Sequence, residues 1–159
     1  MNNSEKKYYA SLDLDKETMS SAGAKSLVVP TFQATYSPPH PLLGPYYSAN
    51  TFIYASLSKD KISVIGRYQA AGVLEQIAIV LPRNIEDGKH PVVPPEQNGV
   101  HIIDLMSDEF YHATKGEITI KRNSEKKIFE AIFDVETKNN ETTYKITHGI
   151  VTLEATGPL

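Results

Sequence analysis

The feature that most constrains the fold of this chain is a succession of short runs rich in Val, Ile, Thr, Tyr and Phe, each ended by turn residues. Such runs favour β-strands, because branched and aromatic side chains pack well on a pleated surface. A helical period is almost absent between them, and residues 15–24 are the one candidate for a short helix or loop. The spacing predicts an all-β fold, an antiparallel meander of about nine strands in a single domain over residues 1–159.

The strands are clearest in the second half of the chain. Residues 116–121 alternate between apolar and polar side chains. In the next segment one face carries Phe129, Ala131, Phe133 and Val135, and the other carries Glu130 and Asp134. A polar turn at 138–141 precedes the last strand, 144–155. Within that strand we expect Gly149 to mark a β-bulge, because the apolar phase shifts there.

The first half is less regular. Residues 8–14 alternate as a strand does, and residues 51–57 and 61–69 predict a hairpin with a short polar turn. The continuous apolar run at 77–81 indicates a central strand that is covered on both faces. Four prolines fall within the nine residues 37–45, which predicts an irregular loop rather than a strand or helix.

The order of segments after residue 76 resembles a known family. An apolar strand at 77–81 is followed by Pro82, the pair Asn84-Ile85, a glycine and a proline, and then by the segments 116–120, 127–133 and 146–153. Over residues 77–154 this series is similar to uncharacterised bacterial lipocalin-like (calycin-like) β-domains. The resemblance implies a meandering lipocalin-like barrel or half-open β-fold. Many such domains are exported lipoproteins, but this chain has no lipobox cysteine, and the family supplies no catalytic residues to carry over.

Composition excludes several functional classes. The chain has no cysteine, so disulfides, thiolate catalysis and cysteine-ligated metals are excluded. A formal charge of −3 argues against a nucleic-acid partner. No apolar run approaches the roughly 18 residues of a membrane-spanning helix. Residues 1–7 are not followed by the apolar run of an export signal, so we expect a soluble, cytoplasmic protein, with a periplasmic or secreted location open if a signal has been removed.

Candidate metal ligands occur where carboxylates and imidazoles lie close in sequence. They are His101, Asp104, Glu109 and His112. The two histidines stand eleven residues apart instead of four, and His101 and Asp104 should lie on opposite faces of one strand. We therefore expect neither a metal nor another cofactor, and a strand end followed by a polar loop explains the four residues. Nucleophile and phosphate-binding motifs are also absent from the sequence, so no catalytic residue is predicted.

Candidate ligand-binding residues combine an apolar body with a polar tip or lie in the proline-rich loop. They are Tyr36, Leu42, Leu43, Tyr46, Tyr47, Tyr68 and His148. A stiff loop over 36–47 suits a barrel lid or a docking surface, because little chain entropy is lost on binding. Leu42 and Leu43 could equally plug one end of the core.

Three functions follow from these observations. The first is a non-enzymatic binding module that holds a small apolar or amphipathic ligand in a barrel or sandwich cavity. The second is a protein-interaction or homo-oligomer domain that uses an edge strand or the loop at 36–47. The third is an enzyme, which would require side chains such as Tyr68, His101, Asp104 and His148 to converge in one pocket.

Overall fold

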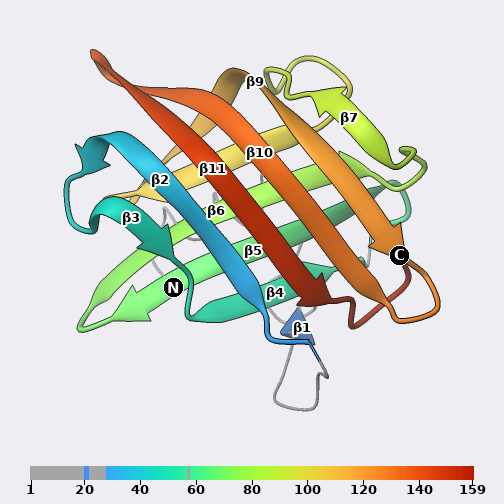
Figure 1. Ribbon diagram of the computed structural model, residues 1–159. Helices are drawn as coiled ribbons and strands as arrows, with labels where there is room; N and C mark the ends of the chain where they lie inside the picture. The colour runs from blue at the N-terminus through green and yellow to red at the C-terminus, as the bar shows by residue number, and fades with distance from the viewer. Residues whose placement is uncertain (1–19, 22–27, 57) are drawn as a thin grey trace.

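The computed structural model describes residues 20–21, 28–56 and 58–159, most of which lie in antiparallel β-strands (Figure 1). The prediction of an all-β fold is confirmed. The strands are β1 (Ser20–Ser21), β2 (Thr31–His40), β3 (Gly44–Ser48), β4 (Thr51–Ala55), β5 (Lys61–Ala70), β6 (Val73–Pro82), β7 (Gly88–Pro91), β8 (His101–Met106), β9 (Glu109–Asn123), β10 (Ile128–Asn139) and β11 (Thr142–Glu154). The predicted strand at 8–14 lies outside the described residues, as does the predicted helix or loop at 15–24 apart from β1.

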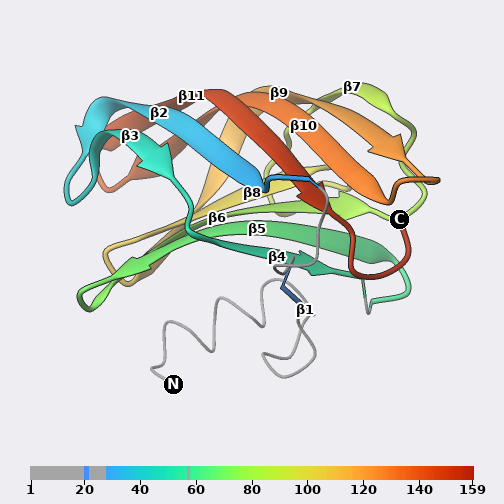
Figure 2. The same ribbon diagram turned by 60° about the horizontal axis from the view of Figure 1, so that its bottom comes forward.

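The strands form one hydrogen-bonded path in the order β1-β4-β5-β6-β8-β9-β10-β11-β2-β3, with β7 paired to β9. From β4 to β11 the path follows the chain as a meander, and the β2–β3 hairpin then joins beyond β11. The sheet curls into a half-barrel. It does not close, because among the described residues the path ends at β1 on one side and at β3 on the other. Figure 2 shows the two halves of the curled sheet facing each other as layers.

The sheet folds over along β9, which belongs to both layers. Its first residues pair with β8, whereas Ala113 and later residues pair with β10. The register shifts at the junction, between Glu136 and Thr137 of β10. Gly116 has a φ of 136°, and a Cβ at this position would overlap the carbonyl oxygen of Asp134. A glycine is therefore required at this position of β9, where a side chain would overlap the backbone of β10.

Large side chains fill the interior between the layers. Phe32 and Phe133 meet edge to face with ring centroids 6.1 Å apart. The Phe32 ring lies against Gly66, and a Cβ on Gly149 would come within 2.5 Å of the Phe133 ring. The middle of the half-barrel is thus closely packed, and burial of each such aromatic ring contributes roughly 1.5–3 kcal/mol.

Several strand predictions are confirmed in detail. Residues 77–81 of β6 are buried throughout, and β10 alternates between buried and more exposed residues. The predicted hairpin corresponds to β4 and β5. A bulge lies at His148-Gly149, where the register with β2 shifts, and His148 takes a φ of 52°. Asp134 accepts a hydrogen bond from the backbone nitrogen of His148 at 2.8 Å and holds the bulge in place.

Two loop predictions are wrong. Most of 37–45 is strand, because β2 extends to His40 and β3 begins at Gly44, so that only residues 41–43 form a turn. The prolines at 38 and 39 are tolerated because neither neighbouring ladder includes them. The polar loop expected around Glu109 and His112 is instead strand β9, which follows β8 after a two-residue turn, Ser107-Asp108. The φ angles of 52° and 66° in this turn suit a tight hairpin.

Candidate functional site

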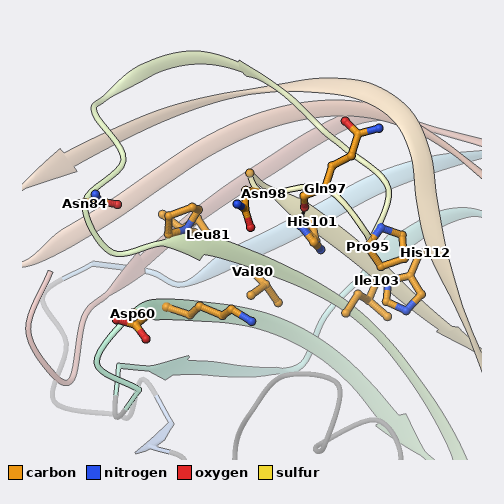
Figure 3. A pocket seen from close by; sticks show the side chains of 13 residues that line it. Asp60, Val80, Leu81, Asn84, Pro95, Gln97, Asn98, His101, Ile103 and His112 are labelled. Atoms are coloured by element: carbon orange, nitrogen blue, oxygen red, sulfur yellow. Dashed lines mark hydrogen bonds between the residues drawn. The ribbon is translucent and has the colours of Figure 1, made fainter.

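A cleft of about 540 Å³ opens on one side of the half-barrel (Figure 3). It lies among the start of β5, the end of β6, the start of β8 and the loop at 94–99. Its lining combines apolar, amide and ionisable side chains. The lining residues are Asp60, Lys61, Val80, Leu81, Pro82, Asn84, Pro95, Gln97, Asn98, Gly99, His101, Ile103 and His112.

The floor of the cleft is apolar and rigid. Val80 and Ile103 belong to a buried cluster, separate from the main core, that also includes Ile65 and Leu105. Val80 pairs with Ser63 on one side and with His101 on the other, so β6 is held on both edges. A floor built on three hydrogen-bonded strands keeps its shape whether or not a ligand is present.

Two walls of the cleft are fixed by polar contacts. On one side the Arg83 guanidinium donates to the carbonyls of Ser56, Ser58 and Lys59, at 2.7 Å for Ser58. The backbone nitrogen of Arg83 also donates to the carbonyl oxygen of Asp60 at 2.8 Å. These contacts anchor the turn that carries the acidic and basic residues of the rim.

The opposite wall is a proline-rich turn. The backbone nitrogen of Gln97 donates to the Pro94 carbonyl at 3.0 Å. His101 lies 2.8 Å, through Nε2, from the Gln97 carbonyl oxygen, so Nε2 carries the hydrogen of this bond. Gly99, with a φ of 148°, supplies the conformation that returns the chain to β8. Prolines and these bonds therefore hold the wall in a defined position.

His112 is the ionisable side chain of the cleft with the most unusual setting. It lies on β9 opposite Ile103, and its ring meets Phe110 edge to face at 5.9 Å. Its Nδ1 atom is buried and has no hydrogen-bond partner among the described residues. Burial lowers the pKa of His112, and nearby His101 lowers it further, against the opposite effect of Glu96. The surroundings of this ring therefore disfavour its protonated form.

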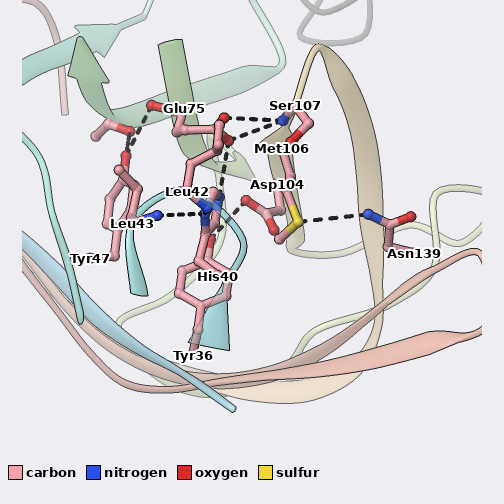
Figure 4. A network of polar contacts seen from close by, with 11 residues as sticks. Tyr36, His40, Leu42, Leu43, Tyr47, Glu75, Asp104, Met106, Ser107 and Asn139 are labelled. Carbon is pink, nitrogen blue, oxygen red and sulfur yellow. Dashed lines mark hydrogen bonds and ion pairs between the residues drawn. The ribbon is translucent and has the colours of Figure 1, made fainter. Parts of the chain in front are cut away.

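A second polar cluster lies inside the half-barrel, beneath the β2–β3 turn (Figure 4). The Nδ1 atom of His40 accepts hydrogen bonds from the backbone nitrogens of Leu42 and Leu43 at 3.1 and 3.2 Å. Its Nε2 atom therefore carries the hydrogen and donates to Glu75 at 3.1 Å. The same carboxylate accepts a bond from the backbone nitrogen of Ser107 at 3.1 Å. Glu75 thus ties together two turns that are distant in sequence.

Asp104 lies beside this pair. Tyr36 donates its hydroxyl hydrogen to Asp104 Oδ1 at 2.8 Å, and the Tyr36 ring meets the His40 ring edge to face at 5.1 Å. Burial raises the pKa of Asp104 to about 7, against the lowering effects of the Tyr36 hydrogen bond and of His40. Burial also raises the pKa of Tyr36 well above its usual value. The Oδ2 atom of Asp104 has no partner among the described residues.

The structure separates the four candidate metal ligands. His101 and His112 line the cleft, whereas Asp104 points into the interior and bonds to Tyr36. Glu109 lies at the start of β9 and accepts a hydrogen bond from Tyr111 at 2.5 Å. No group of three or more potential metal-ligating side chains occurs within the described part of the chain.

The predicted ligand-binding residues also lie apart. Tyr36 and Tyr47 are buried, and Tyr47 donates to the carbonyl oxygen of Gly66 at 2.6 Å. Leu43 and Tyr68 are partly buried against the main core. Leu42 and Tyr46 are exposed, and His148 lies in the exposed bulge of β11. None of the seven lines the cleft.

Sequence reasoning singled out His101, His112, Tyr36 and Asp104, but missed the other residues that build the two polar sites. Asp60 and Lys61 fall in a segment with the pattern of a solvated turn, and residues 94–99 have the pattern of an ordinary loop. Glu75 carried a usable signal, because it is a lone carboxylate between Leu74 and the apolar run that begins at Ile77. His40 carried none, since its role depends on the turn that follows it.

Comparisons with known proteins give no family for this chain. No protein-family model matches it, and searches of curated proteins and of solved structures return no significant match. The resemblance to lipocalin-like domains stays a prediction. The described residues include no helix with the length and apolar character needed to cross a bilayer.

Proposed function

We propose that this protein is a non-enzymatic binding module that holds a small amphipathic molecule in the cleft beside β6 and β8. The observation that carries the proposal is that the cleft combines a suitable volume with an apolar floor and a polar rim. A cleft of about 540 Å³ falls within the range of small-molecule sites. Its apolar floor suits the body of a ligand, and its amides, imidazoles and charged rim suit a polar end. The site differs from the expected interior cavity, because aromatic side chains fill the middle of the half-barrel.

The placement of the polar side chains favours binding over catalysis. An active site would require side chains such as Tyr68, His101, Asp104 and His148 to converge in one pocket. Of these four, only His101 lines the cleft. Asp104 is enclosed in the interior, and His148 forms the bulge of β11 with Asp134.

A titration with octan-1-ol, followed through backbone amide NMR shifts, tests this function. We expect the largest shifts at Val80, Ile103 and His112, with saturation at a single site. Asn98→Trp should abolish the response, because the added ring fills the cleft from its exposed rim. Glu125→Trp is the matched control, since it adds the same ring to the exposed β9–β10 turn away from the cleft. Equal responses in both variants would refute binding at this site.

Exposed apolar side chains on the β2–β3 hairpin favour a second candidate, a protein-docking surface. Tyr46 is 76% exposed and Leu42 is 56% exposed, and β3 is an end strand of the sheet path. Edge strands of this kind can pair with another chain. If the hairpin mediates self-association, the sedimentation coefficient should rise with concentration, and Tyr46→Ser should reduce that rise. A concentration-independent monomer would argue against self-association.

A further inference from the structure

The two imidazoles of the cleft lie together at one end of it. Figure 3 shows His101 and His112 beside Pro95, with Asp60 at the far end. They belong to neighbouring strands, and His112 pairs with Ile103, two residues after His101. Because Ile103 is also part of the floor, a ligand that covers the floor meets both rings at its end.

Both rings keep hydrogen-bonding capacity that the described residues do not use. His101 donates through Nε2 to the Gln97 carbonyl, which leaves Nδ1 for another partner. His112 has a buried Nδ1 atom with no partner within the described residues. Because that atom is enclosed, a ligand in the cleft reaches this ring through Nε2 instead. The arrangement points to a ligand group that can accept hydrogens from His101 Nδ1 and from His112 Nε2.

The charged side chains around the two rings indicate which ligand group would bind between them. Asp60 lies at the other end of the cleft, Lys61 follows it in the lining, and Glu96 is the acidic side chain that acts on His112. Two neighbouring imidazoles repel each other when protonated, and burial penalises a charge on His112. An anion between the rings offsets both penalties, because it stabilises their protonated forms. A carboxylate fits best, since its two oxygens can accept one hydrogen from each ring.

We propose that the ligand of this cleft is a small carboxylic acid with an apolar body, bound by its carboxylate to His101 and His112 with uptake of a proton. This inference rests on the proposed function and narrows its ligand class. The apolar body lies over Val80 and Ile103, and the distal end reaches the Asp60–Lys61 rim. Binding weakens as the pH rises through the titration range of histidine, because the anion then meets neutral rings.

Calorimetry with three probes of equal chain length tests the proposal. The probes are octanoate, octan-1-ol and octylamine, measured at about pH 6 and about pH 7.5 in buffers of different ionisation enthalpy. We expect octanoate to bind about tenfold more tightly than octan-1-ol at the lower pH, as a charge-assisted hydrogen bond allows. We also expect net proton uptake, and a smaller preference at the higher pH.

Three variants locate the carboxylate. His112→Gln and His101→Gln should reduce the octanoate preference to within about threefold, as loss of a charged partner predicts. His90→Gln is the matched control, because His90 lies 2.7 Å from the carbonyl four residues earlier, as His101 does, but is outside the cleft lining. It should leave the preference unchanged.

The remaining outcomes separate the two proposals. Equal binding of octanoate and octan-1-ol without proton uptake would overturn the carboxylate assignment and leave the binding module standing. Tighter binding of octylamine would do the same. If the preference for octanoate is lost in Lys61→Gln but retained in His112→Gln, the carboxylate binds near Lys61 and the assignment to the two histidines is wrong. Binding of none of the probes would refute the proposed function itself.

Discussion

The two ends of β6 hold the ionisable side chains of this molecule in opposite settings. At the Glu75 end, two carboxylates, an imidazole and a phenol are enclosed in the interior and bonded to one another or to backbone nitrogens. At the Pro82 end, two imidazoles and a charged rim line an open cleft. The enclosed groups use their hydrogen bonds to hold turns in place, whereas the groups of the cleft retain capacity for a ligand.

The contrast arises from the alternation of one strand. In β8, His101 and Ile103 face the cleft, while Ile102 and Asp104 face the interior. Successive side chains of a strand point to opposite faces, so a shift of one residue would exchange the two settings. The register of β8 with β6 and β9 therefore determines which polar groups are structural and which are available to bind.

The strongest way to break the comparison is to remove the carboxylate that joins the enclosed groups. Glu75→Ala leaves the Nε2 hydrogen of His40 buried without an acceptor and removes the bond from the backbone nitrogen of Ser107. We expect the free energy of unfolding to fall by about 3–5 kcal/mol, because two donors each lose a hydrogen bond to a carboxylate, at roughly 1.5–3 kcal/mol per bond. Urea denaturation followed by circular dichroism measures the change.

An exposed pair provides the control for this variant. Glu117 contacts Lys89 at 2.8 Å, and both side chains are more than half exposed. Glu117→Ala should change the free energy of unfolding by less than about 1 kcal/mol. Similar losses in the two variants would mean that Glu75 has no special structural role.

Asp104→Asn tests whether the enclosed cluster imposes a pH dependence on folding. Burial raises the pKa of Asp104 to about 7 in the folded protein, above the value of about 3.9 in an unfolded chain. Between these values the folded state retains a proton that the unfolded state has released, so stability falls as the pH rises. From about pH 5 to about pH 7 the native protein should lose roughly 2 kcal/mol relative to the variant.

Parallel denaturation series at several pH values measure this difference. The asparagine keeps an oxygen to accept the Tyr36 hydrogen bond, so the variant should fold normally. Asp108→Asn, in the exposed β8–β9 turn, serves as the control and should retain the native pH profile. Identical slopes for the native protein and Asp104→Asn would show that Asp104 titrates normally.

Arg83→Gln tests whether a change at the cleft end of β6 leaves the Glu75 end unaffected. The variant loses the guanidinium bonds to three carbonyls that hold the rim turn. We expect a loss of about 1–2 kcal/mol in the free energy of unfolding, because the carbonyls regain contact with water. NMR shifts should change at Asp60 and Lys61 but remain constant at Glu75. Shifts at both ends of β6 would indicate that the two settings are coupled.

The sequence predicted the strands better than the sites, for physical reasons. Alternation and turn residues are signals carried by neighbouring residues in the sequence. They were therefore enough to predict the paired strands at 51–69, the buried run at 77–81 and the bulge at Gly149. A site depends on contacts between distant segments. The bond between His40 and Glu75 spans 35 residues, and the cleft joins residues 60 and 112. The prolines at 37–45 also led to a wrong loop prediction. They lie at positions of β2, β3 and the turn between them that take no part in strand pairing, so no backbone N–H is needed there.

The smallest expected effects concern the turn above the enclosed cluster, where two neighbouring leucines provide a matched pair. Leu42 is 56% exposed, whereas Leu43 is partly buried against the main core. Both backbone nitrogens donate to His40, so serine at either position retains that bond. Leu42→Ser should change the free energy of unfolding by less than about 0.5 kcal/mol, as at exposed surface sites. Leu43→Ser should cost about 1 kcal/mol or more, because it exposes apolar surface of the core.

Urea denaturation of the two variants decides which leucine belongs to the fold. The expected order, with Leu43 the more sensitive, would mean that Leu43 covers the enclosed cluster while Leu42 is free to contact a partner. Equal losses would assign both leucines to the plug and remove Leu42 from the candidate docking surface. Equal insensitivity would mean that the cluster is enclosed by the backbone of the turn alone. In that case its separation from solvent depends on the hydrogen bonds to His40 rather than on apolar side chains.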